Sequence, residues 1–228
     1  MSLTHEDNRR ICEVEPGSVM GEMLREHYWF PAYLARELKP GGDPEPLRLL
    51  GRDLVIYRGT SGKVGIINEA CPHRGASMLL ARSEGDSLRC IFHGWRFSVD
   101  GECVEVPTQL DNHDAFCKRV PLKSYPVKEA GDLIWVWLGD GEPKKFPNFI
   151  FTELSGSHVR ASFQLLKFNW IQSVEGLVDT AHISWLHKDW LGAVSDGSTS
   201  LSSATTDSAP RLEIEDQPGG FHYASIRR

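Results

Sequence analysis

Two short clusters of cysteine and histidine constrain the fold of this 228-residue chain more than any other feature. They have the forms Cys-x-His and Cys-x-x-His, are separated by sixteen residues, and consist of Cys71, His73, Cys90 and His93. An isolated cysteine or histidine is usually a packed side chain, but two such clusters so close together indicate a metal site. Structural zinc sites commonly pair a Cys-x-x-Cys with two histidines. One thiolate and one imidazole in each loop favour a two-iron cluster, with zinc or a structural site without metal as alternatives.

The residues around these clusters predict antiparallel β-structure. Apolar runs are separated by turn residues, and paired hairpins would bring both clusters to one tip of the domain. The predicted elements are a helix over 18–27, apolar strands within 46–68 joined by a turn at Ser61-Gly62, a hairpin over 90–107 around Asp100-Gly101, and a buried strand over 133–139.

The composition argues against two classes of partner. The formal net charge is -6, whereas binding to a phosphate backbone requires a basic surface. The longest strongly apolar run, residues 133–138, is far shorter than the roughly 20 residues of a membrane-spanning helix. The N-terminus is charged where a signal peptide is apolar, and the five cysteines lack the spacing of a disulfide framework. We therefore expect a cytoplasmic protein that binds neither nucleic acid nor membrane.

The sequence "CPHRG", followed after a short interval by "CIFHGW", resembles the Rieske [2Fe-2S] signature. The resemblance implies that Cys71 and Cys90 bind one iron and that His73 and His93 bind the other. Two imidazoles in place of two thiolates make the ligand set less anionic, which raises the reduction potential relative to an all-cysteine cluster. Trp95, the last residue of the second motif, is expected to pack in the core, with shielding of the cluster as the alternative.

Residues 168–188 predict an amphipathic helix whose apolar stripe is interrupted by four polar residues. Glu175, Asp179 and His182 follow one another at steps of four and three, so they would share one face; His187 lies five residues further on. Two histidines and two acids together favour a metal site over a structural ion pair. Histidines five apart are about 140° apart on an ideal helix, so we expect the helix to unwind between them or to end near there.

This second motif resembles the mononuclear iron site of Rieske non-haem iron oxygenases. Its spacing and flanking residues are most similar to the phthalate dioxygenase branch, from "MLREHYWFPAYLARELKP" through "APRLEIED". The resemblance implies that His182 and His187 bind iron(II), and that Asp179 bridges the iron histidine to a cluster histidine of a neighbouring subunit. The family's third ligand, a carboxylate on a later helix, has no matching residue in this chain.

The resemblance implies an oxygenase α subunit that accepts electrons from a flavin and iron-sulfur reductase. It would use O2 to hydroxylate or O-demethylate an aromatic acid or aryl ether, as a homotrimer or a multiple of one. The polar residues within 168–188 favour this interpretation, because an electron carrier has no use for a second iron site. The alternatives are a Rieske [2Fe-2S] electron-transfer protein and an inactive, truncated oxygenase.

We predict an α+β chain in two parts. Residues 1–145 would form an N-terminal helix and an antiparallel β Rieske domain, and residues 146–228 the beginning of an incomplete, helix-grip-like α+β catalytic domain. The Ser/Thr-rich segment 195–209 is expected to be mobile, because it has almost no apolar side chain to bury. Residues 211–228 are expected to form two strands around a Pro-Gly-Gly turn.

Overall fold

The computed structural model describes residues 3–194, 207–218 and 220–227 of the chain. These residues form two compact units, Met1–Leu165 and Leu166–Arg228, and the predicted α+β class is confirmed. The predicted domain boundary after residue 145 stays a prediction. No helix in the described part of the chain has the length and apolarity needed to cross a membrane.

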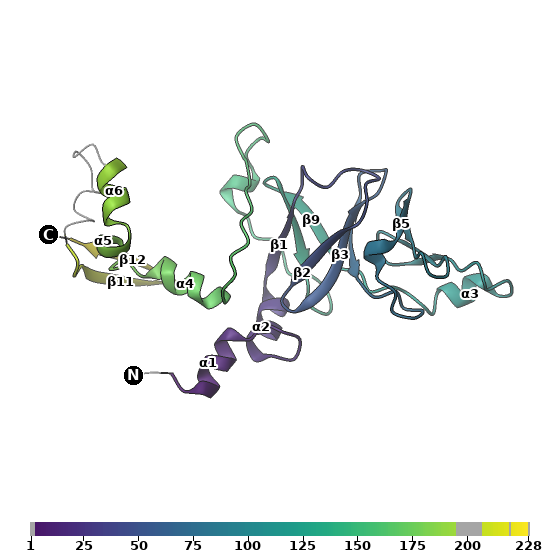
Figure 1. Ribbon diagram of the computed structural model, residues 1–228, viewed down its shortest axis with the longest axis horizontal. Helices are drawn as coiled ribbons and strands as arrows, with labels where there is room; N and C mark the ends of the chain where they lie inside the picture. Colours follow the sequence, from purple (N-terminus) through teal and green to yellow (C-terminus); the bar gives the residue numbers. More distant parts are fainter. Residues whose placement is uncertain (1–2, 195–206, 219, 228) are drawn as a thin grey trace. The chain divides into compact units, whose positions relative to one another are not determined.

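The first unit begins with two short helices and continues as three antiparallel sheets (Figure 1). The helix predicted over 18–27 is α2, and Ser18 caps it, because its hydroxyl accepts a hydrogen bond from the Gly21 amide at 3.2 Å. The elements of the unit are α1 (His5–Cys12), α2 (Val19–His27), β1 (Trp29–Leu34), β2 (Glu45–Leu49), β3 (Arg52–Arg58), β4 (Val64–Asn68), the 3-10 turn η1 (Met78–Leu80), β5 (Arg82–Glu84), β6 (Ser87–Arg89), β7 (Arg96–Ser98), β8 (Cys103–Glu105), α3 (His113–Cys117), β9 (Val127–Ala130), β10 (Leu133–Trp137) and η2 (Ile150–Thr152).

The central residues of β3, 54–57, are buried on both faces of the strand, which explains why these four residues are apolar or aromatic. Leu54 and Ile56 belong to a core formed by the β2-β3-β4 sheet and the β1-β10-β9 sheet. Val55 and Tyr57 point to the opposite face, as the two-residue period of a strand requires, and belong to a second core. This second core contains residues of the β5-β6-β7-β8 sheet, so β3 joins the two halves of the unit.

The strands predicted from the sequence are present, with one turn that was missed. The expected Ser61-Gly62 turn joins β3 to β4, the hairpin around Asp100-Gly101 is β7-β8, and the buried strand is β10. A further turn at Leu50 and Gly51, both with positive φ, separates β2 from β3. This turn is hard to predict from the sequence, because Leu50 adopts a conformation that favours glycine.

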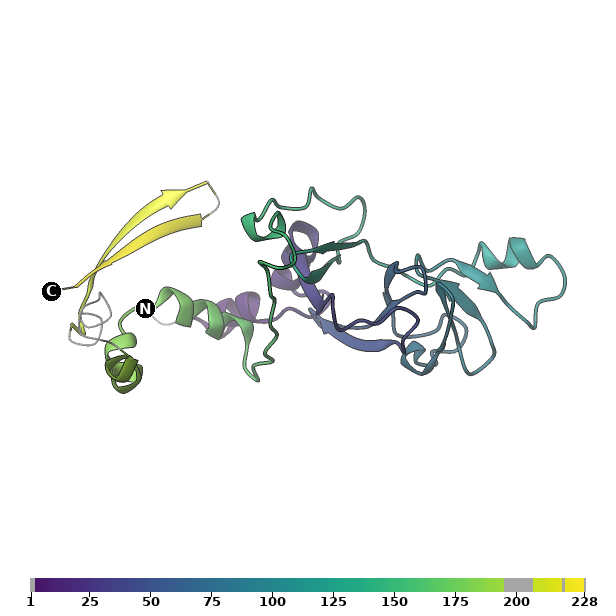
Figure 2. The ribbon, with the colours of Figure 1, turned by 90° about the horizontal axis from the view of Figure 1, so that it is seen from above.

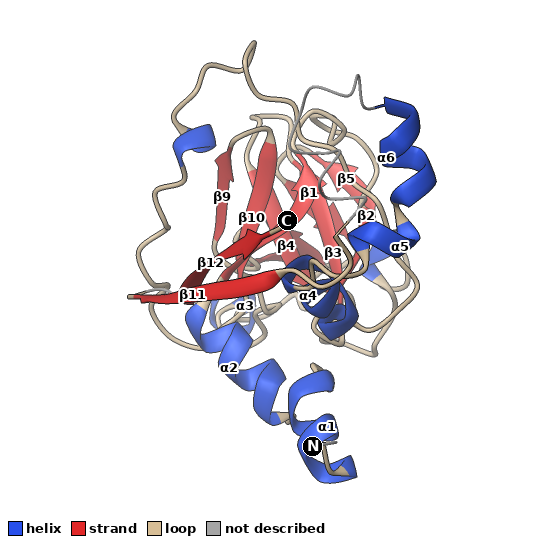
Figure 3. Cartoon of the chain, turned by 90° about the vertical axis from the view of Figure 1, so that its left-hand side faces the viewer, coloured by secondary structure: helices blue, strands red, loops and turns tan. Residues whose placement is uncertain are grey.

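The described residues of the second unit form three short helices and one β-hairpin (Figure 3). The two predicted strands are confirmed as a long antiparallel hairpin, whose register runs from Arg211 paired with Ile226 to Gln217 paired with Gly220 (Figure 2). Of the segment 195–209, residues 195–206 lie outside the described residues, and the expected mobility stays a prediction there. The elements are α4 (Trp170–Val178), α5 (Ile183–Leu186), α6 (Lys188–Val194), β11 (Arg211–Gln217) and β12 (Gly220–Ile226).

The prediction of one helix over 168–188 is wrong. Helix α4 ends at Val178, and Asp179 is extended, with φ -79° and ψ 130°. The Asp179 carboxylate accepts a hydrogen bond from the Ala181 amide at 2.8 Å, so the side chain replaces the helical partner of that amide. The chain turns helical again at α5, which ends at Leu186, directly before His187. The expected end between the histidines is therefore present, but the break before His182 was not predicted.

Candidate metal centres

The two cysteine-histidine clusters lie on loops that are built in the same way. One loop follows β4 and the other joins β6 to β7. In the first, the Cys71 amide donates to the Ala76 carbonyl at 2.9 Å, and the Gly75 amide donates back to the Cys71 carbonyl at 2.8 Å. In the second, the amides of Cys90 and Gly94 make the equivalent bonds at 2.8 Å and 3.0 Å.

Each loop closes through a glycine in the left-handed conformation. The φ angles are +70° for Gly75 and +74° for Gly94, which an L-residue adopts only at a cost. The spacing Cys-x-His-x-Gly in one loop and Cys-x-x-His-Gly in the other therefore gives the same turn with the histidine at a different step. This difference sets the direction from which each imidazole leaves its loop.

The structure brings the four predicted cluster ligands together in two pairs. Cys71 and Cys90 are both buried, at 3% exposure, and the two thiols interact with each other. His73 and His93 are half-buried, and their ring centroids lie 4.5 Å apart. Two thiols on the buried side and two imidazoles on the more exposed side match the ligand set of a two-iron cluster in which each iron takes one kind of donor.

Two details of the loops fit a bound [2Fe-2S] cluster. The buried Nδ1 atom of His73 has no hydrogen-bond partner among the described residues, and a metal ion would satisfy this nitrogen. Burial raises the pKa of the Cys71 thiol to about 11, so this thiol needs a nearby cation to become a thiolate ligand. No group of three or more histidine, cysteine or acidic side chains in the described ranges could hold a single metal ion.

Trp95 has both of the roles considered for it. It is buried, and its ring also stacks on His73 with the centroids 4.5 Å apart and the planes 6° apart. Phe116 contacts the other side of this stack, edge to face with Trp95 at 5.6 Å. A cluster histidine is thus held by a rigid aromatic contact, and desolvation lowers the pKa of His73, which keeps its ring neutral and available as a donor.

Arg89, which directly precedes Cys90, supports the second loop and was missed in the sequence. Its guanidinium donates to the Gly94 carbonyl at 2.9 Å and pairs with Glu84 at 2.7 Å and Glu105 at 2.9 Å. Arg89 holds the pKa of both carboxyls below their ordinary value. The signal that points to this role is the strand register, which places Arg82, Arg89 and Arg96 side by side and so requires acidic partners.

In the second unit, the structure brings Asp179, His182 and His187 together. The Nδ1 atom of His182 lies 3.0 Å from Oδ2 of Asp179, and the His182 and His187 ring centroids are 5.2 Å apart. Because a carboxylate only accepts hydrogen bonds, His182 carries its proton on Nδ1 and leaves Nε2 free to bind a metal. Glu175 is exposed on α4; its carbonyl accepts the Asp179 amide at 3.0 Å, but its side chain makes no hydrogen bond to this group among the described residues.

Asp179 and His182 meet for a different reason from the one predicted. They do not share a helical face, because Asp179 ends α4; the extended backbone at Asp179 and the turn to α5 bring them together. Residues of the β12 end hold this turn: Arg227 donates to the Thr180 carbonyl at 2.6 Å, and Thr180 donates to Ser225 at 3.2 Å. The Ala181 amide and then the His182 side chain lower the pKa of Asp179, so it stays ionised.

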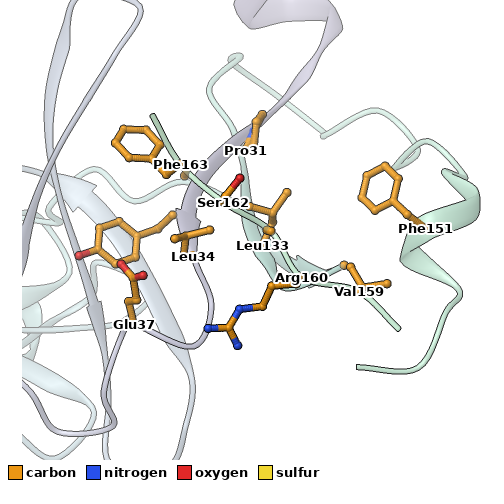
Figure 4. A pocket seen from close by; sticks show the side chains of 13 residues that line it. Pro31, Leu34, Glu37, Leu133, Phe151, Val159, Arg160, Ser162 and Phe163 are labelled. Carbon is orange, nitrogen blue, oxygen red and sulfur yellow. The ribbon is translucent and has the colours of Figure 1, made fainter. Parts of the chain in front are cut away.

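An apolar pocket of about 670 Å³ lies in the first unit, between β1 and the segment 159–163 (Figure 4). Its labelled side chains are apolar except for Glu37, Arg160 and Ser162. It contains no residue of either predicted metal site, and no feature of the sequence predicted this pocket. We assign it no ligand.

Known families match both parts of the chain. Residues 28–126 match the Rieske [2Fe-2S] domain family, and residues 136–228 match the family described as "LigXa C-terminal domain like". A solved structure titled as the reduced complex between oxygenase and ferredoxin in carbazole 1,9a-dioxygenase aligns with a TM-score of 0.66 at 25% identity. It covers 89% of this chain and 55% of that chain.

Curated relatives align with nearly the whole chain. The phthalate 4,5-dioxygenase oxygenase subunit of Pseudomonas putida is 38% identical over 99% of this chain and 53% of its own length. The 5,5'-dehydrodivanillate O-demethylase oxygenase subunit of a Sphingobium species is 32% identical over 99% of this chain and 52% of its own length. The chain spans about half the length of these relatives. It belongs to the Rieske non-haem iron oxygenases, in the branch of the phthalate dioxygenase oxygenase subunits.

Proposed function

We propose that this chain is the N-terminal part of a Rieske oxygenase α subunit that hydroxylates or O-demethylates an aromatic acid or aryl ether. The observation that carries the proposal is the group of Asp179, His182 and His187, in a chain that also contains the two cluster loops. An electron carrier needs the loops alone. An oxygenase needs both sets of residues.

In this proposal, Cys71, His73, Cys90 and His93 bind the [2Fe-2S] cluster, and His182 and His187 bind iron(II). When bound, the cluster supplies single electrons and the iron supplies O2 activation. The residues of the chain orient these groups. Asp179 fixes the tautomer of His182 and aims its Nε2 atom.

Asp179 has a second proposed role between subunits. It is half exposed, so its carboxylate remains accessible while it binds His182. We expect it to bridge His182 to a cluster histidine of a neighbouring subunit, in a homotrimer or a multiple of one. The electron donor is expected to be a flavin and iron-sulfur reductase. The expected compartment is the cytoplasm, where cysteine thiols stay reduced.

Metal analysis distinguishes the oxygenase from the carrier. Protein purified without oxygen should contain about three irons and two sulfides per chain and be red-brown, and reduction with dithionite should give an EPR signal of low average g, as expected for histidine ligation. His182→Ala should lower the iron count by one and leave the sulfide count and the EPR signal unchanged. Two irons and two sulfides in the unaltered chain support an electron-transfer protein, and a colourless zinc protein excludes both.

The bridging role of Asp179 is tested in the complete enzyme with Asp179→Asn. The cluster should remain reducible and the iron should remain bound, because Asp179 is not proposed as a ligand. Single-turnover oxidation of the pre-reduced cluster, with substrate and O2, should slow by orders of magnitude. Glu175→Gln, an exposed acid four residues away, should react at the unaltered rate. A normal rate in Asp179→Asn would contradict the bridge.

A further inference from the structure

Two cysteines outside the cluster loops lie against each other in the first unit. The Sγ atoms of Cys103, on β8, and Cys117, at the end of α3, are 3.1 Å apart. Neither residue belongs to a cluster loop or to the proposed iron site. Burial raises the pKa of the Cys103 thiol to about 12, and this thiol donates to the sulfur of Cys117.

The surrounding contacts fix the separation between these two sulfurs. His113, at the start of α3, accepts a hydrogen bond at Nε2 from the Val106 amide at 3.0 Å, which ties α3 to the end of β8. The side chain of Phe116 packs on Trp95. Cys117 is therefore held against the strand by contacts on both sides of it, and little further ordering is needed to join the sulfurs.

A metal ion is a poorer occupant of this position. Two thiolates bound to one zinc ion at about 2.3 Å are held farther apart than the observed contact when their geometry is tetrahedral. His113 completes no metal site with them, because no group of three or more histidine, cysteine or acidic side chains in the described part of the chain could hold a metal ion. A disulfide bond of about 2.05 Å requires the two sulfurs to approach each other by about 1 Å from the 3.1 Å contact.

Small oxidants can reach the pair. A cavity of about 480 Å³ is lined by both cysteines, His113 and Lys118, among other residues. Cys103 is half-buried, and Cys117 is 7% exposed. A peroxide fits such a space, and the lining of this cavity contains neither of the cluster cysteines.

We propose that Cys103 and Cys117 form a reversible disulfide when the protein meets a peroxide. One thiol loses its proton to solvent and attacks hydrogen peroxide as the thiolate; the O–O bond breaks, a sulfenic acid forms, and the leaving hydroxide takes up a proton to give one water. The second thiol then displaces a second water from this sulfenic acid and forms the S–S bond. The sulfur pair loses two electrons and the two peroxide oxygens gain them. A small-molecule dithiol restores the reduced pair by exchange.

Trypsin separates the proposed disulfide pair from the cluster cysteines, which makes the test direct. Cleavage after Arg96 and Lys118 releases one peptide that carries both Cys103 and Cys117, while Cys71 and Cys90 fall on two other peptides. Cluster-loaded protein is treated with hydrogen peroxide, quenched with catalase, and denatured in an alkylating reagent. Mass spectrometry then reports which cysteines were labelled.

The expected result is a peptide 97–118 that is unlabelled at both cysteines and lighter by two hydrogens. The peptides of Cys71, Cys90 and Cys12 should stay labelled. Cutting after Glu105 should give two fragments that separate only on reduction. Cys12→Ser should leave this result unchanged, and Cys103→Ser should abolish the linked fragments.

The proposal is overturned if peptide 97–118 remains doubly labelled in the unaltered chain, or if Cys103 is found linked to a cluster cysteine. The labelling of peptide 97–118 is measured on the unaltered protein, so the test remains valid even if Cys103→Ser does not fold. It is independent of the proposed function, because the oxidant is added and no turnover is needed.

Discussion

The matched turns of the two cluster loops lead to a quantitative prediction for Gly75→Ala and Gly94→Ala. Both glycines have a φ near +70°, where an L-residue costs about 1–2 kcal/mol. A Cβ atom at Gly75 meets nothing within 4 Å, so about 1 kcal/mol is the whole expected loss for that variant. A Cβ atom at Gly94 lies 3.2 Å from Cγ of Pro107.

The close contact at Gly94 adds a second cost. Moving Pro107 by a few tenths of an ångström adds about 1 kcal/mol or more, by comparison with overpacked cores. We expect about 2–3 kcal/mol for Gly94→Ala, and roughly 2–4 °C of Tm per kcal/mol for a unit of this size. The assay is thermal unfolding of cluster-loaded protein, followed by circular dichroism and by the visible absorbance of the cluster.

Two controls isolate the contact from the backbone cost. Gly85→Ala, in the turn between β5 and β6, has a φ of +63° and open space around the added Cβ, so it should match Gly75→Ala. Pro107→Ala should recover most of the difference when combined with Gly94→Ala. Equal losses at Gly75 and Gly94, or a larger loss at Gly75, would show that the contact at Pro107 does not determine the outcome.

Three further changes test other parts of the structure. Arg25→Met should destabilise the first unit by about 3 kcal/mol in urea unfolding, because the buried guanidinium donates to three backbone carbonyls worth about 1 kcal/mol each. Unchanged stability would contradict this. The two glutamates paired with Arg89 have lowered pKa values, so they stabilise the fold above their ordinary pKa of 4.5, and this stability is lost as the pH falls through the lower folded-state values. In Arg89→Gln, the drop in Tm between about pH 6 and about pH 3 should be smaller than in the unaltered chain. An equal drop would show that the ion pairs of Arg89 with the two glutamates do not cause the loss of stability at low pH. Closing the disulfide between Cys103 and Cys117 should raise the stability by about 3 kcal/mol, the expectation for a loop of about 15 residues, measured by urea unfolding with and without reductant.

The features that could be predicted from the sequence depend on contacts between residues that are close together along the chain. The cluster loops each close within six residues, so their spacing alone determines the turn and the position of the donors. The strands were predicted from short apolar runs bounded by turn residues. In β3, successive residues of such a run alternate between two cores: Leu54 and Ile56 face one, and Val55 and Tyr57 face the other.

The features that were missed depend on distant contacts. Helix propensity favours a continuous helix through Asp179, but the Asp179 carboxylate takes the Ala181 amide, and Arg227 and Ser225 hold Thr180 from the end of β12. Asp179, His182 and His187 nevertheless lie together, and their roles as ligands and bridge, which the resemblance supplied independently of the helix, stay predictions. The approach of Cys103 to Cys117 follows from the packing of α3 on β8, and the spacing of the two cysteines in the sequence does not predict this packing.

The two units differ in how completely they bury their apolar side chains, and this has a consequence for assembly. The first unit has two cores of its own, whereas Leu177, Trp185 and Leu186 of the second unit are each at least 75% exposed. Protein domains generally fold as units, N-terminal first, while the ribosome is still adding residues. The cluster loops therefore reach their final shape early in synthesis, and delivery of iron and sulfide to them can be finished before the residues that would hold the second iron are in place.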